Sequence, residues 1–429
     1  MDAPARPDLS LRLKLLVVAV LYVAEGIPFG FIITSMNAYM SGQGVPPEQI
    51  GALSLLGLAW SLKFFWSPLV DRYGSRATWI VAAQVVLILC LTALGYLAAG
   101  PVTLGFWVIL GMLCVASATQ DLAIDAYTID FLETSELGLA NGIRSGAYRI
   151  GSLAAGSGLL ILADHIGWPP AIFGIGILLA VLALTIFAFR PFHLPRVQTG
   201  VPAEDGPLVT FVTALKGLWG HSAFLVIVLF TLSYKAGDAM MGTMVIPFWK
   251  NQHFTNTEIG VVSGILGSVA TSLGALLGGW FTSRFGIARS LWVLGLFQAV
   301  SNLGYWVAAL PGMGRKVLFE ISVPFLAAAY PVYPIYLASQ GESLSSGLGY
   351  APFMAFLMSL CDKRFSATQY AFFVFLSVLS GRIMGFLGGF GVKYLGFASF
   401  FFATFLVALP AFALLPWILP VARQIEGRE

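Results

Sequence analysis

The chain has 429 residues, of which 58% are hydrophobic and only 10% charged, and its mean hydropathy is +0.86. A soluble domain carries about 25% charged residues, so this composition excludes a soluble fold, a disordered chain and a disulfide scaffold. The net charge of +3 is too small for a nucleic-acid-binding surface. The three cysteines and four histidines show no metal-ligand spacing, so we expect no metal and no cofactor. The remaining class is a polytopic membrane protein.

Twelve apolar stretches are long enough to cross a bilayer, which needs about 20 residues per helix. They are 14–40, 50–70, 78–99, 104–129, 141–163, 169–189, 222–248, 258–282, 288–310, 334–360, 367–390 and 397–420. The polar stretch 190–221 divides them into two sets of six. The sequence therefore predicts an all-α membrane protein with two six-helix bundles, 1–189 and 222–429. A cytoplasmic linker, with room for a short surface helix at 207–219, joins them.

Two apolar segments need a separate interpretation. The first span is too long for a cleavable signal peptide, and Glu25-Gly26-Ile27-Pro28 interrupts it where a signal peptide would be uniform. We expect it to remain in the mature chain. The insert at 315–333 carries Pro324 and Pro331, so we interpret its apolar part, 317–333, as an interfacial helix in an outer loop and not as a thirteenth span.

The distribution of basic residues predicts the orientation. Of the 23 lysines and arginines, four lie in the loops that would be outside and four lie inside spans. The other fifteen lie on the expected inner face, in the linker, the inner loops, the termini or the inner ends of spans. The positive-inside rule therefore places both termini in the cytoplasm.

The two halves of the chain resemble each other. Tyr22-Val-Ala-Glu-Gly in the first span matches Tyr234-Lys-Ala-Gly-Asp in the seventh, and the loop DRYGSR that begins at Asp71 matches SRFGIAR, which begins at Ser283. Repeated halves of six spans are typical of secondary transporters, in which two bundles move around a site near the membrane midplane. DRYGSR also resembles the loop signature of the major facilitator superfamily.

Several longer segments resemble one branch of that superfamily, the muropeptide permease (AmpG) family. They are LLGLAWSLKFFWSPLVDRYGSR (55–76), ASATQDLAIDAYTIDFL (116–132), GIRSGAYRIGSLAAG (142–156), YKAGDAMMG (234–242), GLFQAVSNLGYW (295–306), ESLSSGLGYAPFMAFLMSLCDKRFSATQYA (342–371) and SVLSGRIMGFLGG (377–389). The resemblance implies a monomeric, proton-driven importer in the bacterial inner membrane. The implied cargo is GlcNAc–anhydro-MurNAc and its peptides, taken up for cell-wall recycling and β-lactamase induction.

Ionisable residues inside the spans are candidates for the site, because a charge at mid-bilayer is costly without a partner or a water-filled cavity. Asp121 and Asp125 share one face of the fourth span. The fifth span returns beside it, which predicts an Asp125–Arg144 pair near the inner end and an Asp121–Arg149 pair deeper. The first pair would be structural and the second would couple transport to protons. A structural ion pair is the alternative role for every one of these charges.

The seventh span carries Lys235 and Asp238 at a spacing of three residues, which allows a local ion pair. Glu25 and Asp238 occupy matching depths in the two halves. With no histidine inside any span, we expect the proton to be carried by a carboxylate. The proton-coupling candidates are Asp121, Asp125, Glu25 and Asp238.

The implied cargo carries carboxylates and sugar rings, so arginine, lysine, tyrosine and amide side chains are candidates for binding it. The substrate-binding candidates are Arg149, Arg382, Lys235, Tyr22, Tyr148, Tyr234, Gln120 and Glu342. The candidates for a conformational gate or loop motif are Asp71, Arg72, Arg76, Arg144 and Lys63. For Arg382 an outer gate with Glu342 is the alternative. The GxxxG pairs 142/146 and 274/278 indicate close helix contacts.

Three other functions stay open at this point. The first is a related transporter of another solute, such as an acyl-coenzyme A. The second is a membrane-embedded enzyme acting on lipid-linked sugars, which the lack of a nucleophile–base set or metal spacing disfavours. The third is a non-transporting signal protein. The sequence therefore predicts a small-molecule transporter that works within the lipid bilayer and is not an enzyme.

Overall fold

The computed structural model describes residues 9–132, 137–189, 192, 223–321, 330–360 and 366–426, and nearly all of them are helical. The chain divides into two compact units. Unit 1 comprises Met1–Val45, Leu56–Gly200 and Thr255–Gly264, and unit 2 comprises Pro46–Leu55, Val201–Phe254 and Ile265–Glu429. The bundle limits and linker expected from the sequence remain predictions. The surface helix expected at 207–219 lies outside the described residues.

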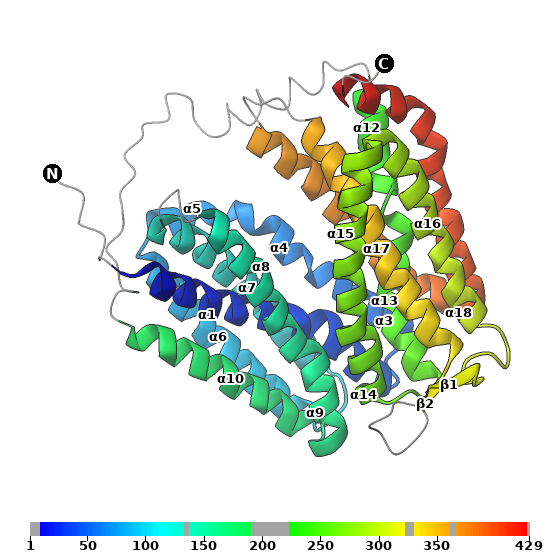
Figure 1. Ribbon diagram of the computed structural model, residues 1–429. Coiled ribbons are helices and arrows are strands. Elements are labelled where there is room, and N and C mark those ends of the chain that lie inside the picture. Colours follow the sequence, from blue (N-terminus) through cyan, green and yellow to red (C-terminus); the bar gives the residue numbers. More distant parts are fainter. Residues whose placement is uncertain are drawn as a thin grey trace. The chain divides into compact units, whose positions relative to one another are not determined.

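Unit 1 contains most of the first half of the chain (Figure 1). Its elements are α1 (Leu11–Gly30), η1 (Phe31–Met36), α2 (Asn37–Gly42), α4 (Leu58–Leu62), η2 (Lys63–Phe65), α5 (Ser67–Arg72), α6 (Arg76–Leu97), α7 (Leu104–Phe131), α8 (Leu137–Leu153), η3 (Ala154–Gly158), α9 (Leu159–Ile166), α10 (Trp168–Ala188), α14 (Asn256–Glu258) and most of η5 (Ile259–Leu266). Here η1, η3 and η5 are π-helical and η2 is a 3₁₀-helix.

Helix α1 is central to unit 1, because it packs against α7, α8 and α10. Glycines allow the closest of these contacts. A Cβ atom on Gly26 would lie 2.1 Å from the carbonyl oxygen of Tyr148, and one on Gly151 would lie 2.0 Å from that of Val23. Since no side chain fits in such a space, α1 and α8 meet backbone to backbone. This approach brings the polar side chains of α1 close to those of its neighbours.

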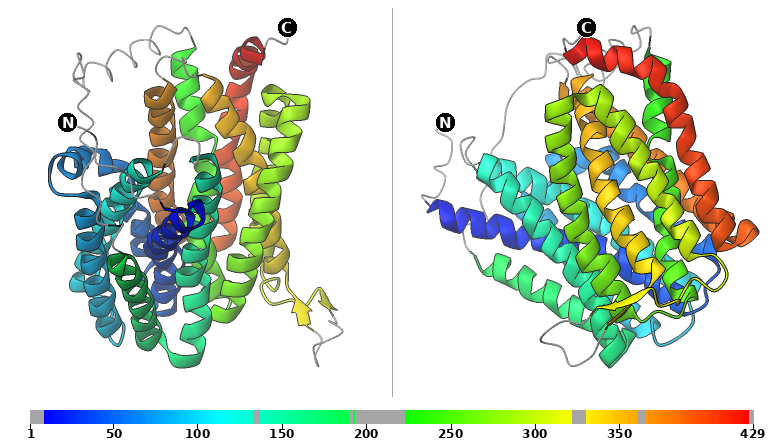
Figure 2. Two further views of the ribbon diagram at one scale, coloured as in Figure 1. Left: turned by 60° about the vertical axis from the view of Figure 1, so that its left-hand side comes forward. Right: turned by 45° about the vertical axis from the view of Figure 1, so that its right-hand side comes forward.

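Unit 2 contains most of the second half of the chain. Its elements are α3 (Pro47–Leu56), α12 (Phe224–Ser233), α13 (Ala236–Asn251), α15 (Gly267–Phe285), α16 (Ile287–Ala308), β1 (Phe319–Ile321), β2 (Tyr330–Val332), α17 (Pro334–Ser359) and α18 (Ser366–Glu426). Helix α17 lies between α15 and α16, and α18 packs against α12, α13 and α16 (Figures 1 and 2). The backbone of α18 is kinked at Gly396, whose φ of 73° suits a glycine.

Nine helical stretches within the described residues are long and apolar enough to cross a membrane. This count is consistent with twelve spans. Helix α18 covers the expected eleventh and twelfth spans, and its kink at Gly396 lies between them. Helix α17 covers the expected tenth span but is rich in serine and glycine. The expected second span, 50–70, is divided among α3, α4, η2 and α5, with a break at Gly57.

Two expectations about local structure were wrong. The insert does not form an interfacial helix where it is described. Instead β1 and β2 pair antiparallel, with Phe319 opposite Val332 (Figure 2). Pro331 lies in β2, an edge strand, where the missing backbone N–H of a proline is tolerated. In the GxxxG pairs, Gly274 and Gly278 do contact α17 closely, whereas nothing lies within 4 Å of a Cβ atom on Gly146.

Candidate functional site

Glu25 lies in the middle of α1 and is 6% exposed. Pro28 follows it within one turn. A proline cannot donate the usual helical hydrogen bond to the residue four positions earlier, so the backbone is perturbed beside Glu25. The π-helical segment η1 follows directly, and such segments are frequent at functional sites.

Two further carboxylates approach Glu25 from α7. Asp121 and Asp125 are separated by one helical turn and share a face of that helix. One oxygen atom from each of Glu25, Asp121 and Asp125 lies within 4.8 Å of the others. Three acids this close repel each other strongly unless cations or protons neutralise them.

Two cations enter the same site. Lys63, from η2, pairs with Asp121, and its Nζ atom lies 3.9 Å from Asp125. Arg144, from α8, lies 2.7 Å from the other oxygen of Asp125. We call the five residues Glu25, Lys63, Asp121, Asp125 and Arg144 the unit 1 charge cluster. With every member ionised, it has three negative and two positive charges and a net charge of −1.

Tyr22 completes the site from α1. Its hydroxyl donates a hydrogen bond of 2.7 Å to Asp125, and the Arg144 guanidinium lies 4.8 Å from the centre of its ring. The ring is 1% exposed. Tyr22 therefore orients both members of the Asp125–Arg144 pair.

These contacts confirm one expected ion pair and correct another. Arg144 does pair with Asp125. Asp121 pairs with Lys63 and not with Arg149, which lies on an exposed part of α8. Lys63 was expected as a gate residue, or as a group that binds a cargo carboxylate, and not as the partner of Asp121. The 3₁₀ turn η2, at the end of α4, is what brings it to α7.

One carboxyl oxygen in the cluster is left over. Glu25 touches Asp121, yet its Oε2 atom is buried and has no hydrogen-bond partner among the residues the structure describes. Two carboxyl groups form a hydrogen bond only when one of them holds a proton. The cluster can therefore accept one proton at Glu25 and Asp121, which would bring its net charge to zero.

Unit 2 contains a second set of charges. Lys235 lies at the break between α12 and α13, and its Nζ atom is 3.6 Å from Asp238. This confirms the expected local pair. Glu342 of α17 interacts with both Lys235 and Asp238. It therefore lies beside this pair, whereas the sequence suggested it only as a gate partner of Arg382 or as a substrate-binding residue.

The other expected site residues form no ion pair that is described in these two groups. Gln120 is fully buried on α7, and neither of its amide atoms has a partner in the described part of the chain. Tyr148 of α8 packs against Phe29, and Tyr234 stacks on Phe353 with 4.9 Å between ring centres. Arg382 is half-buried in α18.

The loop-motif residues are only partly visible. Arg76 begins α6 and donates a hydrogen bond of 2.9 Å to the carbonyl of Val70. This contact ties α6 to the end of α5. Asp71 and Arg72 belong to α5, but their side chains lie outside the described residues, so their gate role remains a prediction.

Sequence analysis missed one set of polar residues. Gln298, Asn302 and Tyr305 lie on one face of α16 and are at most 3% exposed. Their spacing of four and three residues in an otherwise apolar helix was the available signal. They face the Lys235–Asp238–Glu342 set, since Asn302 lies beside Asp238 and Tyr305 beside Glu342.

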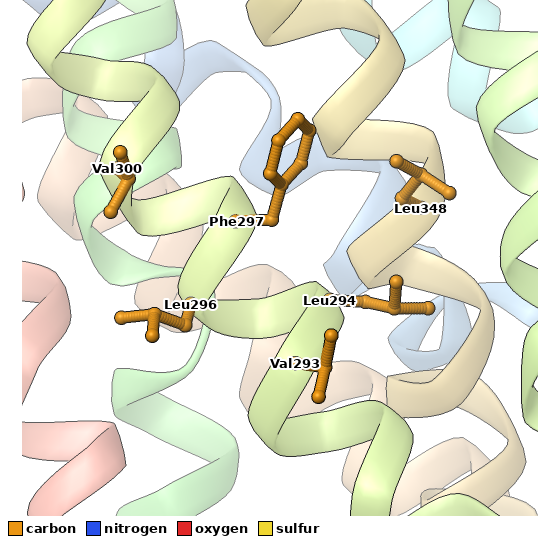
Figure 3. Close-up of a pocket in the computed structure, with 6 residues that line it drawn as sticks. All are labelled: Val293, Leu294, Leu296, Phe297, Val300 and Leu348. Atoms are coloured by element: carbon orange, nitrogen blue, oxygen red, sulfur yellow. The ribbon is translucent and has the colours of Figure 1, made fainter. Parts of the chain in front are cut away.

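An apolar groove of about 420 Å³ also lies on unit 2 (Figure 3). Its lining comes from α16 and α17 and consists of Val293, Leu294, Leu296, Phe297, Val300 and Leu348. Since none of these side chains is polar, the groove offers nothing to bind a charged group. The candidate site is therefore the buried charge clusters and not this groove.

Comparison with known proteins identifies the family. The family model of the Major Facilitator Superfamily matches residues 16–385 of the chain. The chain is 31% identical over 411 residues to the anhydromuropeptide permease of Escherichia coli (strain K12), covering 93% of this chain and 78% of that protein. It is 26% identical over 416 residues to the putative transporter AmpG 4 of Rickettsia conorii, covering 94% and 96%.

A solved structure gives the same fold. A bacterial homologue of the human lysosomal transporter Spinster superposes with a TM-score of 0.69 at 15% identity, over 97% of this chain and 98% of that one. With the helical architecture and the charged residues buried in it, these matches identify a multi-pass membrane transporter and not an enzyme. The chain belongs to the major facilitator superfamily and, within it, to the anhydromuropeptide permease (AmpG) family.

Proposed function

We propose that this protein imports anhydromuropeptides across the bacterial inner membrane, driven by protons. The observation that carries the proposal is its 31% identity, over 93% of the chain, to a protein named anhydromuropeptide permease. Import for cell-wall recycling, with β-lactamase induction as a consequence, follows from the same likeness. We further propose that the protein acts as a monomer with both termini in the cytoplasm, as its basic residues predict.

The cargo presents sugar rings and carboxylates. Arginine binds a carboxylate through two parallel hydrogen bonds, whereas lysine supplies charge without that planar geometry. We assign carboxylate binding to Arg149 and Arg382, and contacts with the sugars to Tyr148 and Gln120. Under this assignment Arg382→Lys weakens uptake of peptide-bearing cargo much more than uptake of the bare anhydro-disaccharide. Equal losses for both cargoes would favour a gate role for Arg382.

The unit 1 charge cluster is our candidate for proton coupling. Its net charge of −1 is costly inside a membrane, and one proton removes it. Glu25 is the natural acceptor because it is buried, forms no ion pair with a cation in the described part of the chain and touches Asp121. The three carboxylates would also fit a metal ion. We favour a proton because Lys63 and Arg144 already neutralise two of the three.

A transport assay tests the proposal directly. Purified protein in vesicles should accumulate labelled anhydro-disaccharide when a pH gradient is imposed, and a protonophore should abolish accumulation. Glu25→Gln fixes the cluster in its neutral form, so this variant should exchange cargo across the membrane without accumulating it. Chelation of divalent cations should have no effect. Accumulation that survives the protonophore would reject proton coupling, and a lack of uptake of any anhydromuropeptide would reject the cargo.

A further inference from the structure

The seventh expected span is broken in the middle. Helix α12 ends at Ser233 and α13 begins at Ala236, with Tyr234 and Lys235 between them. Other side chains compensate the interrupted backbone: Ser380 of α18, for example, donates a hydrogen bond to the carbonyl of Leu232. Broken membrane helices are tolerated where polar neighbours satisfy the freed backbone groups, and they are common at ion and substrate sites.

Three charged side chains gather at this break. Lys235 lies 3.6 Å from Asp238, its Nζ atom contacts the carbonyl of Ser346 at 3.4 Å, and Glu342 interacts with both charged partners. The side chains of Lys235 and Asp238 are only 17% and 15% exposed. Two acids and one base leave a net charge of −1, the same excess as in the unit 1 charge cluster.

Buried polar groups around these charges provide an independent observation. Asn302 is fully buried on α16 and lies beside Asp238, yet neither of its amide atoms makes a hydrogen bond of ordinary geometry with any described residue. The Tyr234 hydroxyl and both amide atoms of Gln298 are in the same situation. A buried polar group without a partner is destabilising. Such a set indicates a site that takes a ligand.

The groups facing the two acids come from the helices packed around them. They are Tyr234 and Lys235 at the break, Asn302 and Tyr305 on α16, and Ser343 on α17, while Tyr350 of α17 lies against Lys235. Gln298 lies one helical turn from Asn302 on α16. From α18, Gly381 approaches Ala239, and Arg382 is the next residue. We call Tyr234, Lys235, Asp238, Gln298, Asn302, Tyr305 and Glu342 the unit 2 polar cluster.

We propose that the unit 2 polar cluster is a second proton-binding site, so that the transporter moves two protons with each substrate molecule. A hydronium ion transfers one proton to a carboxylate oxygen of Asp238 or Glu342: its O–H bond breaks, a carboxyl O–H bond forms, a water molecule leaves, and the charge of the cluster changes from −1 to zero. Lys235 acts as the built-in counter-ion of whichever acid stays ionised. The ratio of two protons rests on the proton coupling proposed above, whereas the binding of the proton does not.

A proton fits this cluster better than a metal cation. The Lys235 ammonium lies beside Asp238, where it would repel a second cation. A proton instead becomes part of the carboxyl group, and at Asp238 it can be donated to the amide oxygen of Asn302, which lies beside it. This arrangement would satisfy one of the buried acceptors that now lack a partner.

The first experiment measures protonation without transport. Infrared spectra of the purified full chain, recorded while the pH is raised, should show two protonated carboxyl groups losing their protons. Glu342→Gln leaves the Lys235–Asp238 pair charge-balanced, so the variant should fold and should show only one protonated carboxyl group. Glu25→Gln should remove the other signal. Glu320→Gln, on the exposed strand β1, is the matched control and should keep both.

A double variant tests whether charge balance sets the proton count. Lys235→Met combined with Glu342→Gln leaves Asp238 alone, so the net charge is again −1. The double variant should therefore regain the signal that Glu342→Gln lost. If Glu342→Gln keeps both signals, or if the double variant keeps only one, the second site is rejected. A signal suppressed by sodium at constant pH would also reject it, in favour of a sodium site.

The second experiment measures the proton ratio. At equilibrium, a pH difference of one unit supports about 100-fold accumulation of cargo with two protons and about 10-fold with one. The unaltered protein should reach the higher value and Glu342→Gln the lower. A 10-fold limit in both would overturn the ratio of two. If no variant transports anhydromuropeptide while the infrared signals behave as expected, the proposed cargo fails and the second proton site stands.

Discussion

Glu48 of α3 and Lys393 of α18 lie 345 positions apart in the chain, and their Oε1 and Nζ atoms are 2.6 Å apart. Around this pair the two helices meet closely. A Cβ atom on Gly389 would lie 2.3 Å from the carbonyl oxygen of Pro47, and one on Gly51 would lie 2.8 Å from that of Phe386. The ion pair therefore holds a backbone contact in place at one end of α3.

The pair makes the stability of unit 2 depend on pH. The hydrogen bond from Lys393 holds the pKa of Glu48, which precedes the expected second span, below its usual value. A carboxyl group with a lowered folded-state pKa contributes stability above its unfolded-state pKa and loses it as pH falls through the folded-state value. Glu48→Gln should therefore lower the melting temperature slightly at neutral pH and leave it unchanged in acid. A thermal unfolding series across pH tests this, with Glu320→Gln as the control. An equal loss in acid would contradict it.

Removing one cation from the unit 1 charge cluster should destabilise the folded protein, as the loss of one partner of a buried ion pair does. Lys63→Met leaves three carboxylates with only Arg144, and loss of one partner of a buried pair costs about 3–5 kcal/mol. We expect this variant to be poorly folded in the membrane. Adding Asp121→Asn removes the surplus charge and should restore folded protein, though not accumulation of cargo. Size-exclusion profiles of the single and double variants measure this. No recovery in the double variant would mean that Lys63 contributes mainly through packing.

The helices could be predicted well because a long apolar run leaves few alternatives in a membrane. The expected tenth span, 334–360, agrees with α17, and the expected ninth, 288–310, with α16. The contacts between helices were harder to predict than the helices themselves. Counting residues along a span gives the depth of a charge but not the direction in which it points. That is why Arg149 was expected beside Asp121 and Lys63 was not.

Breaks in the helices explain the other differences. Lys63 reaches Asp121 of α7 from η2, the 3₁₀ turn that interrupts the second span, and nothing in the sequence indicated this turn. The polar face of α16 was overlooked because its amide and hydroxyl groups carry no formal charge, and no charged residue in the middle of that helix drew attention to the expected ninth span. The Gln298–Asn302–Tyr305 spacing becomes meaningful once Asp238 and Glu342 are known to lie opposite it.

The orientation in the membrane can be tested by cysteine labelling. We expect Arg315→Cys, in the loop after α16 that should lie outside, to react with a membrane-impermeant maleimide added outside cells. Asp205→Cys, in the expected cytoplasmic linker, should react only after the membrane is permeabilised. Both variants need a background without the three native cysteines. The opposite labelling pattern would reject the orientation, and labelling of both sites from outside would reject the twelve-span count.

Two glycines on α15 offer a matched test of helix packing. A Cβ atom on Gly274 would lie 2.1 Å from the carbonyl oxygen of Leu344, whereas nothing lies within 4 Å of one on Gly279. Gly274→Ala should force α15 and α17 apart and lower stability by about 1–3 kcal/mol. Gly279→Ala should be neutral or slightly stabilising, because alanine favours the helix by about 1 kcal/mol. Melting temperatures of the two variants compare the positions directly. Equal melting temperatures would contradict the close approach of the two helices.

Tyr22 supports the unit 1 charge cluster in two separable ways. Its hydroxyl donates to Asp125, and its ring lies under Arg144. Tyr22→Phe removes only the hydrogen bond, and since bonds to charged groups contribute about 1.5–3 kcal/mol, we expect a loss of stability in that range. Tyr22→Leu also removes the ring, and a cation–π contact contributes about a further 0.5–2 kcal/mol. The melting temperature should therefore be highest for the unaltered protein, lower for Tyr22→Phe and lowest for Tyr22→Leu. If Tyr22→Phe has the melting temperature of the unaltered protein while Tyr22→Leu has a lower one, the ring alone holds Arg144 and the hydroxyl is dispensable.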